Sequence, residues 1–233
     1  MEASINKISA VQVWVTFLGL LLLPALVLFL SGDWLWLEGW LFGAWFMTLC
    51  VSAILYLYRN DPALLAERYK KPGDGSQEVW DVFLVIGINL GFLAWLVLIP
   101  LDAKRFTWSP VFPLWVKLLG IIFMFGCFFL MYRSYVDNTY LSALVRIQAD
   151  RQHKVVSTGV YGFVRHPMYL GGSLLFLGVP LLLGSLVGVL IGILMILIIA
   201  GRIIGEEKML IEELEGYTEY QRKVRYRLIP YVW

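Results

Sequence analysis

The residues whose types and spacing could do chemistry gather in two short stretches of the chain, residues 161–169 and 202–207. They read Tyr161-Gly-Phe-Val-Arg165-His166-Pro-Met-Tyr169 and Arg202-Ile-Ile-Gly-Glu206-Glu207. In the second stretch, Arg202 and Glu206 are four residues apart and therefore share one face of a helix. Two cations, two carboxylates and aromatic walls suit a zwitterionic ligand with hydroxyl groups and a flat ring. An amino acid joined to a nucleoside is one such ligand.

The two stretches can form one site only if the chain between them doubles back. Residues 170–201 are 32 residues without a charge, and one straight helix of that length would be about 48 Å long. The hydrocarbon of a bilayer is only about 30 Å thick. Pro180 and Gly184-Ser185 lie near the middle of the run, and such residues interrupt helices. We therefore predict a tight helical hairpin that turns near Leu183, with both arms short for a full span. A single tilted helix, the alternative, would place the two stretches on opposite faces of the membrane.

The composition is that of an integral membrane protein. Apolar residues make up 60% of the 233 residues and charged residues 15%, against about 25% charged in soluble domains. A net charge of +2 provides no basic surface for nucleic acid. His153 and His166 are 13 residues apart with no cysteine nearby, so we predict no metal site. Cys50 and Cys127 lie in apolar runs, which favours buried thiols over a disulfide.

Before the hairpin, four apolar segments have the length of a membrane-spanning helix, about 20 residues. They are Val11–Leu30, Glu38–Tyr58, Trp80–Leu101 and Leu114–Arg133. We predict an all-α polytopic integral membrane protein with these four spans, a C-terminal helical hairpin and a cofactor pocket on the cytosolic face. In the third span, Asn89 is predicted to make an interhelical hydrogen bond.

Two segments outside the spans have helical patterns. In the loop 59–79, Asp61 before Pro62 is typical of a helix start, and the apolar residues that follow predict a short helix in the membrane interface. The segment Gly205–Arg227 is predicted to be helical, because Leu210, Leu214 and Tyr217 recur at the spacing of one apolar helix face.

The distribution of charge predicts the orientation of the chain. With four spans and a hairpin, 16 of the 19 Lys and Arg residues fall on the side that holds both termini. The positive side of a membrane protein is cytoplasmic, so we expect cytoplasmic N- and C-termini. A single crossing in place of the hairpin would leave 10 cations against 9, which fits the rule less well.

Several motifs resemble the isoprenylcysteine carboxyl methyltransferase family of membrane methyltransferases, including its bacterial relatives. The strong match runs from residue 134 to the end, whereas the N-terminal half matches as a hydrophobic pattern plus the loop 59–79. The matching residues are Val145-Arg146-Ile147-Gln148, His153-Lys-Val-Val156, Gly159-Val-Tyr161, Arg165-His166-Pro167-x-Tyr169-x-Gly171, Arg202-x-x-x-Glu206-Glu207-x-x-Leu210, Gly216-Tyr217-x-x-Tyr220, Pro230, Asp61-Pro62-x-Leu64-Leu65-Ala-Glu67-Arg68 and Trp80-Asp81.

The resemblance implies S-adenosylmethionine as methyl donor, a prenylated cysteine carboxylate as acceptor, and a bacterial inner membrane location. It implies a methyltransferase core at residues 134–233, preceded by N-terminal transmembrane helices at 1–133. Arg165 and Arg202 match the family's catalytic arginines, and we add Glu207 as the third catalytic candidate. The implied cofactor-binding residues are Gln148, His153, Gly159, Val160, Tyr161, Arg165, His166, Pro167, Tyr169, Glu206 and Glu207.

The predicted mechanism is methyl transfer to an anionic carboxylate, which requires no general base. Arg165, with Arg202, is predicted to orient the acceptor and the cofactor's own carboxylate through bidentate hydrogen bonds. Glu206 and Glu207 would hold the amino group or the ribose hydroxyls, and Glu207 would be the base if the acceptor were an amine. On this hypothesis, Arg165→Ala loses activity but leaves folding mostly intact.

Two other functions remain open from the sequence. A membrane reductase that uses NADPH would need cations for the 2′-phosphate, and the tail has Arg222, Lys223, Arg225 and Arg227. A transporter or scaffold is less favoured, because transporters place charges at mid-membrane and these spans have none. The expected partners are membrane lipids and a lipophilic small-molecule or lipid-modified substrate, and the oligomeric state is left open.

Overall fold

The computed structural model describes residues 10–74 and 76–233, and every regular element in these ranges is a helix. The elements are α1 (Ala10–Ser31), α2 (Leu37–Asn60), α3 (Pro62–Arg68), α4 (Val79–Pro100), the π-helical turn η1 (Leu101–Arg105), α5 (Leu114–Asp137), the 3₁₀ turns η2 (Ala149–Arg151) and η3 (Gly159–Gly162), α6 (Pro167–Leu183), α7 (Leu186–Glu213) and α8 (Tyr217–Lys223). The predicted all-α class is therefore confirmed.

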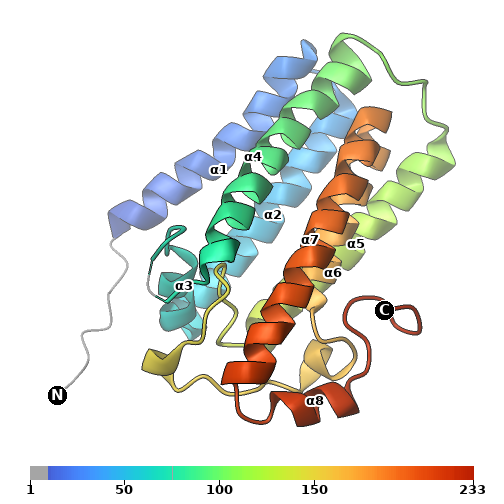
Figure 1. The fold of residues 1–233 in the computed structure, drawn as a ribbon. Helices are drawn as coiled ribbons and strands as arrows, with labels where there is room; N and C mark the ends of the chain where they lie inside the picture. The colour runs from blue at the N-terminus through green and yellow to red at the C-terminus, as the bar shows by residue number, and fades with distance from the viewer. Residues whose placement is uncertain (1–9, 75) are drawn as a thin grey trace.

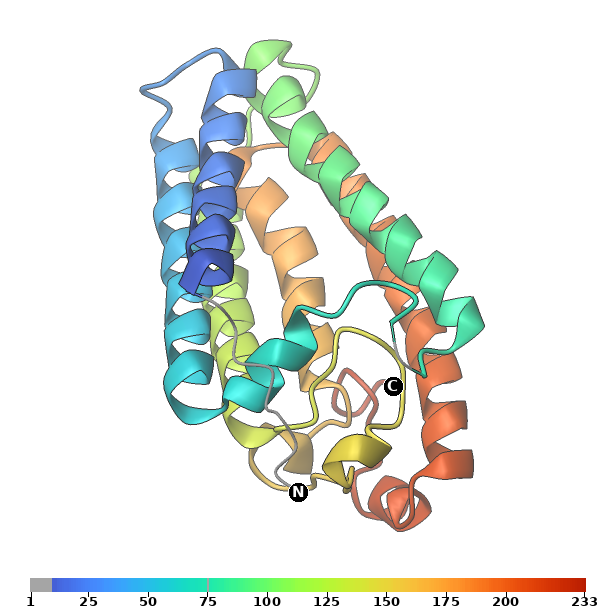
Figure 2. The same ribbon diagram turned by 90° about the vertical axis from the view of Figure 1, so that its left-hand side faces the viewer.

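The six long helices pack side by side as one bundle (Figures 1 and 2). Four segments are long and apolar enough to cross a membrane: α2, α4 continued by η1, α5 and α7. Two shorter apolar helices, Val15–Ser31 and Pro167–Leu183, complete the set. The four spans predicted before the hairpin correspond to α1, α2, α4 and α5, each extended by a few residues. The protein is thus an integral membrane protein.

The predicted hairpin is present, and its turn lies where Pro180 and Gly184 indicated. Gly184 adopts φ +84°, a left-handed conformation in which its amide donates to the Pro180 carbonyl at 2.9 Å. Ser185 then caps α7 by accepting from the amide of Gly188 at 2.8 Å. The 17 residues of α6 span about 26 Å and the 28 of α7 about 42 Å. The prediction of two short arms is therefore wrong for α7, which continues unbroken beyond the apolar run.

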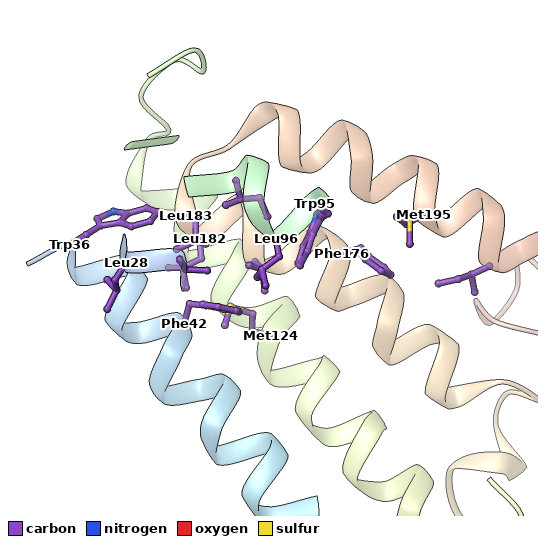
Figure 3. Packing of buried hydrophobic residues seen from close by; sticks show 14 of the residues in the cluster. Leu28, Trp36, Phe42, Trp95, Leu96, Met124, Phe176, Leu182, Leu183 and Met195 are labelled. Atoms are coloured by element: carbon purple, nitrogen blue, oxygen red, sulfur yellow. The ribbon is translucent and has the colours of Figure 1, made fainter. Parts of the chain in front are cut away.

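The apolar core contains buried residues from all six long helices, and one part of it lies between α4, α6 and α7. Trp95, Phe176 and Met195 meet there, and each is at most 5% exposed (Figure 3). The indole of Trp95 donates to the carbonyl of Gly188 at 3.0 Å, which joins α4 to the start of α7. Because α6 also packs against α5, the first turn of α6 is held from several sides.

One end of the bundle carries a layer made of α3, residues 138–166 and α8, at the opposite end from the hairpin turn (Figures 1 and 2). The predicted start of α3 is confirmed, because the Asp61 carboxylate accepts from the amide of Leu64 at 2.9 Å and Pro62 is the first helical residue. Leu64 and Leu65 are buried beneath α3, which anchors this helix on the bundle.

Two helical predictions need correction. Gly205–Arg227 is not one helix, because α7 ends at Glu213 and α8 begins only at Tyr217. The predicted apolar face is nevertheless real, since Leu210, Leu214 and Tyr217 pack in one buried cluster. The amide of Asn89 does not reach another helix: it donates to the Val85 carbonyl of its own helix at 2.8 Å.

Candidate active site

A cavity of about 460 Å³ lies between the bundle and the end layer, within the range of about 300–1,000 Å³ for small-molecule sites. One wall is apolar except for Asn89 and comes from α4 and α6, with Val85, Ile88 and Phe92 on α4 and Phe176 on α6. The other wall is polar and comes from residues 138–169, α7 and α8. The cavity therefore joins the membrane-spanning part of the protein to its polar end.

The two chemically distinctive stretches do meet at this cavity, as the hairpin prediction required. Seven of the predicted site residues line it: His153, Tyr161, Arg165, His166, Tyr169, Arg202 and Glu206. Five others lie outside its wall: Gln148, Gly159, Val160, Pro167 and Glu207.

Most of the N–H donors of Arg165 form hydrogen bonds within the protein. Its Nε and Nη2 donate to the two carboxylate oxygens of Glu207 at 2.6 and 3.2 Å. Its Nη1 donates to the carbonyls of Val224 and Arg225 at 2.7 and 2.8 Å, just after α8. Only one N–H of Nη2 has no protein partner in the described part of the chain. The predicted bidentate grip of Arg165 on a ligand therefore does not match this arrangement.

Glu207 is the centre of this network and is 2% exposed. Besides Arg165, it accepts from Nε of Arg227 at 2.7 Å, and Nε2 of His166 lies 3.1 Å from Oε1. The carboxylate thus joins α7 to the start of α6 and to the C-terminal tail. Because it is surrounded by these donors and lies outside the cavity wall, Glu207 is placed to position Arg165 and does not face a ligand.

Arg202 is held in the same way by Asp81 at the start of α4. Its Nε and Nη2 donate to the Asp81 carboxylate at 2.7 and 3.1 Å, and Nη2 also donates to the Ala143 carbonyl at 2.8 Å. Asp81 is fully buried and also accepts from the amide of Val145 at 2.8 Å. Nη1 of Arg202 has no hydrogen-bond partner among the residues that the structure describes. Arg202 therefore offers the cavity a single donor group.

Glu206 provides the negative charge of the cavity. The phenol of Tyr169 donates to its carboxylate at 2.6 Å, and no cation pairs with it within the described ranges. The guanidinium of Arg202 lies over the Tyr169 ring, 5.7 Å from its centroid. Glu206 is thus available to bind a cation or a hydroxyl group of a ligand.

Two cavity-lining side chains carry buried polar atoms without a hydrogen-bond partner in residues 10–74 and 76–233: Oη of Tyr217 and Nδ1 of His153. A third buried hydroxyl on the cavity, that of Tyr161, has Asn138 and Ser134 as side-chain neighbours. Burial raises the pKa of both phenols. Burial also lowers the pKa of His153 to about 4, with a further contribution from the charges of Arg151 and Arg146. All three groups are therefore neutral at pH 7. An unsatisfied buried polar group costs about 1–3 kcal/mol, so two of them on one cavity indicate a polar ligand.

Four of the predicted residues outside the cavity shape the backbone around it. Gln148 donates to the Tyr140 carbonyl at 2.6 Å and accepts from Arg151 at 2.8 Å. Gly159 has φ +59°, and any side chain there would collide with the Asp137 carboxylate, to which the Val160 amide donates at 2.9 Å. The fourth, Pro167, is the first residue of α6. The Asp137 carboxylate therefore occupies the amide of Val160, one of the implied cofactor-binding residues.

Two features of the site were not assigned from the sequence. One is the partnership of Asp81 with Arg202. The other is a buried pair in which Arg146, on the cavity wall, donates to both carboxylate oxygens of Glu67 on α3 at 2.8 and 3.1 Å. The available signal was a carboxylate at the start of an apolar span, which needs a partner once it is buried. Spacing along the chain does not indicate which cation that partner is.

Comparison with known proteins places this site in a class. Residues 115–215 match the family described as phospholipid methyltransferase. The protein-S-isoprenylcysteine O-methyltransferase of Schizosaccharomyces pombe is 27% identical over 83% of this chain and 86% of its own. The enzyme of the same name from Saccharomyces cerevisiae is 32% identical over 53% of this chain and 52% of its own.

A solved structure has the same fold. It is that of the eukaryotic intramembrane Ras methyltransferase, an isoprenylcysteine carboxyl methyltransferase, with a TM-score of 0.51 at 20% identity over 91% of this chain and 73% of the other. The fold, the cavity at the end of the bundle and these relatives define an integral membrane methyltransferase, which acts with a methyl donor. Within that class, both curated relatives are protein-S-isoprenylcysteine O-methyltransferases, to which this chain is similar.

Proposed function

We propose that this protein transfers a methyl group from S-adenosylmethionine to the carboxylate of a lipophilic acceptor of the prenylated-cysteine type. The observation that carries the proposal is one cavity with an apolar wall among membrane-spanning helices and a polar wall with unpartnered polar atoms on Tyr217 and His153. A lipid-tailed acceptor fits the first wall, and a zwitterionic nucleoside fits the second. The names of the relatives support the same reaction.

The residues of the polar wall fit the cofactor. Glu206 suits its ammonium group or ribose hydroxyls, and the hydroxyls of Tyr161 and Tyr217 and the free nitrogen of His153 provide neutral partners for its polar atoms. When bound, the cofactor supplies an electrophilic methyl group, which an anionic carboxylate accepts without losing a proton. Glu207 is accordingly not required as a base.

The two arginines act as fixed donors in this proposal. Glu207 holds Arg165 and Asp81 holds Arg202, so neither guanidinium has to be ordered when the ligands bind. Such preorganised charges are effective in a site that excludes water. Arg165 keeps one N–H of Nη2 for a ligand and Arg202 keeps the NH₂ group of Nη1, so in both residues the fork of Nε and Nη2 is already used by the protein. Glu207 becomes a positioning residue.

The location of the reaction follows from the charge distribution. With the predicted spans, 16 of the 19 Lys and Arg residues fall on the side of the end layer, so we place this layer, with both termini, on the cytosolic side of a bacterial inner membrane. Residues 134–233 supply the polar wall and the α6 part of the apolar wall, and the helices of residues 1–133 supply its α4 part.

The test is a methyl-transfer assay with tritiated S-adenosylmethionine and a membrane lipid extract, followed by treatment of the product with base. We expect label that base releases as methanol, since a methyl ester is hydrolysed. Label that resists base would mean transfer to nitrogen or sulfur and would contradict the proposal. The reductase alternative has no support from the cavity, because Arg222, Lys223 and Arg225 lie outside its wall and Arg227 is bound to Glu207. Calorimetry with NADPH should detect no binding.

A further inference from the structure

Four arginines line the cavity, and three of them are already neutralised. Each of the three donates through Nε and Nη2 to both oxygens of one buried carboxylate. The pairs are Arg146 with Glu67, Arg165 with Glu207 and Arg202 with Asp81. Each of these carboxylates is at most 3% exposed. The Nε and Nη2 donors of these three guanidinium groups are therefore used in ion pairs within the protein.

Arg68, the last residue of α3, differs from the other three. It lines the same cavity and is half-buried, yet it has no hydrogen bond or ion pair with any residue that the structure describes. Its guanidinium lies over the Tyr135 ring of α5, 5.5 Å from the centroid. A cation stacked on a ring face is held in place while the N–H groups in its own plane stay free. Arg68 thus presents a guanidinium group that is held in place by the ring and whose N–H donors are free to bind a ligand.

The position of Arg68 separates it from the proposed donor site. In both views α3 lies at the end of α2, whereas α8 lies at the end of α7, beyond residues 138–166 (Figures 1 and 2). The unpartnered Tyr217 and the carboxylate of Glu206 belong to α8 and α7. The cavity therefore has a negative group on the α7 side and a free cation on the α3 side.

The apolar wall lines the same cavity as Arg68. Val85, Ile88 and Phe92 line the cavity along α4 over about 10 Å, and α4 borders the cavity together with Arg68. A lipid tail against this wall would place a terminal carboxylate within the polar end of the cavity. Arginine binds carboxylates through two parallel hydrogen bonds, which a point charge such as the exposed Lys154 does not provide.

We propose that Arg68 is the acceptor-binding residue: its free fork holds the carboxylate of the lipophilic acceptor, while Arg165 and Arg202 serve as braced donors beside it. The inference rests on the proposed function and adds the residue that selects an anionic acceptor. It requires that substitution of Arg68 weakens binding of the acceptor and leaves binding of the methyl donor unchanged.

The experiment compares Arg68→Gln and Arg68→Lys with wild type, in phosphate-free detergent micelles and in phospholipid vesicles. Steady-state KM values are measured for S-adenosylmethionine and for an N-acetyl-S-prenylcysteine acceptor. We expect Arg68→Gln to raise the acceptor KM by about 10- to 100-fold in both media, with the donor KM changed by less than about 2-fold. Arg68→Lys keeps the charge but lacks the fork, so its acceptor KM should be intermediate. Arg59→Gln is the matched control, because Arg59 is an exposed arginine outside the cavity wall.

The outcomes separate the two proposals. Wild-type protein that methylates no carboxylate acceptor would overturn the proposed function and this inference with it. Active wild type with an acceptor KM unchanged in Arg68→Gln, or with a raised donor KM instead, would overturn the inference alone. An effect seen only in phospholipid vesicles would show that Arg68 binds a lipid phosphate, which also contradicts it. Since Arg68 has no ionic partner in the described chain, all variants should unfold at the wild-type temperature.

Discussion

Asp81→Asn tests whether the buried pair with Arg202 supports both the fold and the site. The substitution preserves the shape of the side chain but removes its charge. An asparagine offers one acceptor oxygen and one NH₂ group, and the NH₂ group would face N–H donors of Arg202 or Val145. Arg202 would then remain 8% exposed without its counter-ion.

The expected cost of Asp81→Asn is large, because removing one partner of a buried pair leaves an uncompensated charge, at about 3–5 kcal/mol. Asp150→Asn is the matched control. The Asp150 side chain is 60% exposed and lies 3.2 Å from Arg146, and exposed pairs contribute about 0–1 kcal/mol. Free energies of unfolding are measured by denaturant titration in micelles, and methyl transfer is measured on the same samples.

A double-mutant cycle with Arg202→Gln isolates the pair. We expect each single variant to lose several kcal/mol and the double variant to lose far less than their sum, since no buried charge is left unpaired in it. Methyl transfer should be reduced in all three, because Arg202 no longer has a fixed position. Losses that add within about 0.5 kcal/mol, or a stable and active Asp81→Asn protein, would refute the role given to this pair.

Three further variants test other parts of the site. Glu207→Gln removes the carboxylate that holds Arg165, so methyl transfer should fall more than 100-fold and proteases should cut the tail after α7 faster. A tail as resistant to proteases as in wild type would contradict the role of Glu207 in holding it. Tyr217→Phe should raise the donor KM without loss of stability, because the Tyr217 hydroxyl has no protein partner in the described ranges. Tyr220→Phe should instead be destabilised, because the Tyr220 hydroxyl donates to a carbonyl at 2.8 Å. A destabilised Tyr217→Phe with an unchanged donor KM would refute the assignment. Burial raises the pKa of Glu67, but hydrogen bonds from Arg146 and two neighbours outweigh it and hold that pKa at about 2. The ionised Glu67 carboxylate contributes its full stabilisation above pH 4.5, and this contribution is lost as the pH falls toward 2. Lowering the pH should therefore reduce the free energy of unfolding of wild type more than that of Glu67→Gln. Equal slopes of this free energy against pH would count against the pair of Glu67 with Arg146.

The role of Arg165 illustrates how the structure changes an expectation. From the sequence, Arg165→Ala should leave folding mostly intact. In the structure the same guanidinium joins α6, α7 and the tail through Glu207 and two carbonyls. Its loss would leave Glu207 with one charged donor fewer, so we now expect a loss of stability together with activity.

The sequence by itself determined the helices, the hairpin and the meeting of the two polar stretches. These features depend on local properties: the length of an uncharged run against the thickness of a bilayer, a proline and a glycine near its middle, and the Asp61 cap before Pro62. Each of these properties belongs to one continuous segment of the chain and can be read from that segment alone. They could therefore be predicted without knowledge of the packing.

The ionic partners were decided only by the tertiary structure. Arg202 meets a carboxylate 121 residues away and Arg165 one 42 residues away, and several carboxylates along the chain were equally available to either. An ion pair depends on distance and burial in three dimensions, neither of which sequence spacing records across separate helices. For the same reason, only the folded structure distinguishes the three arginines that hold the protein together from Arg68, whose fork stays free.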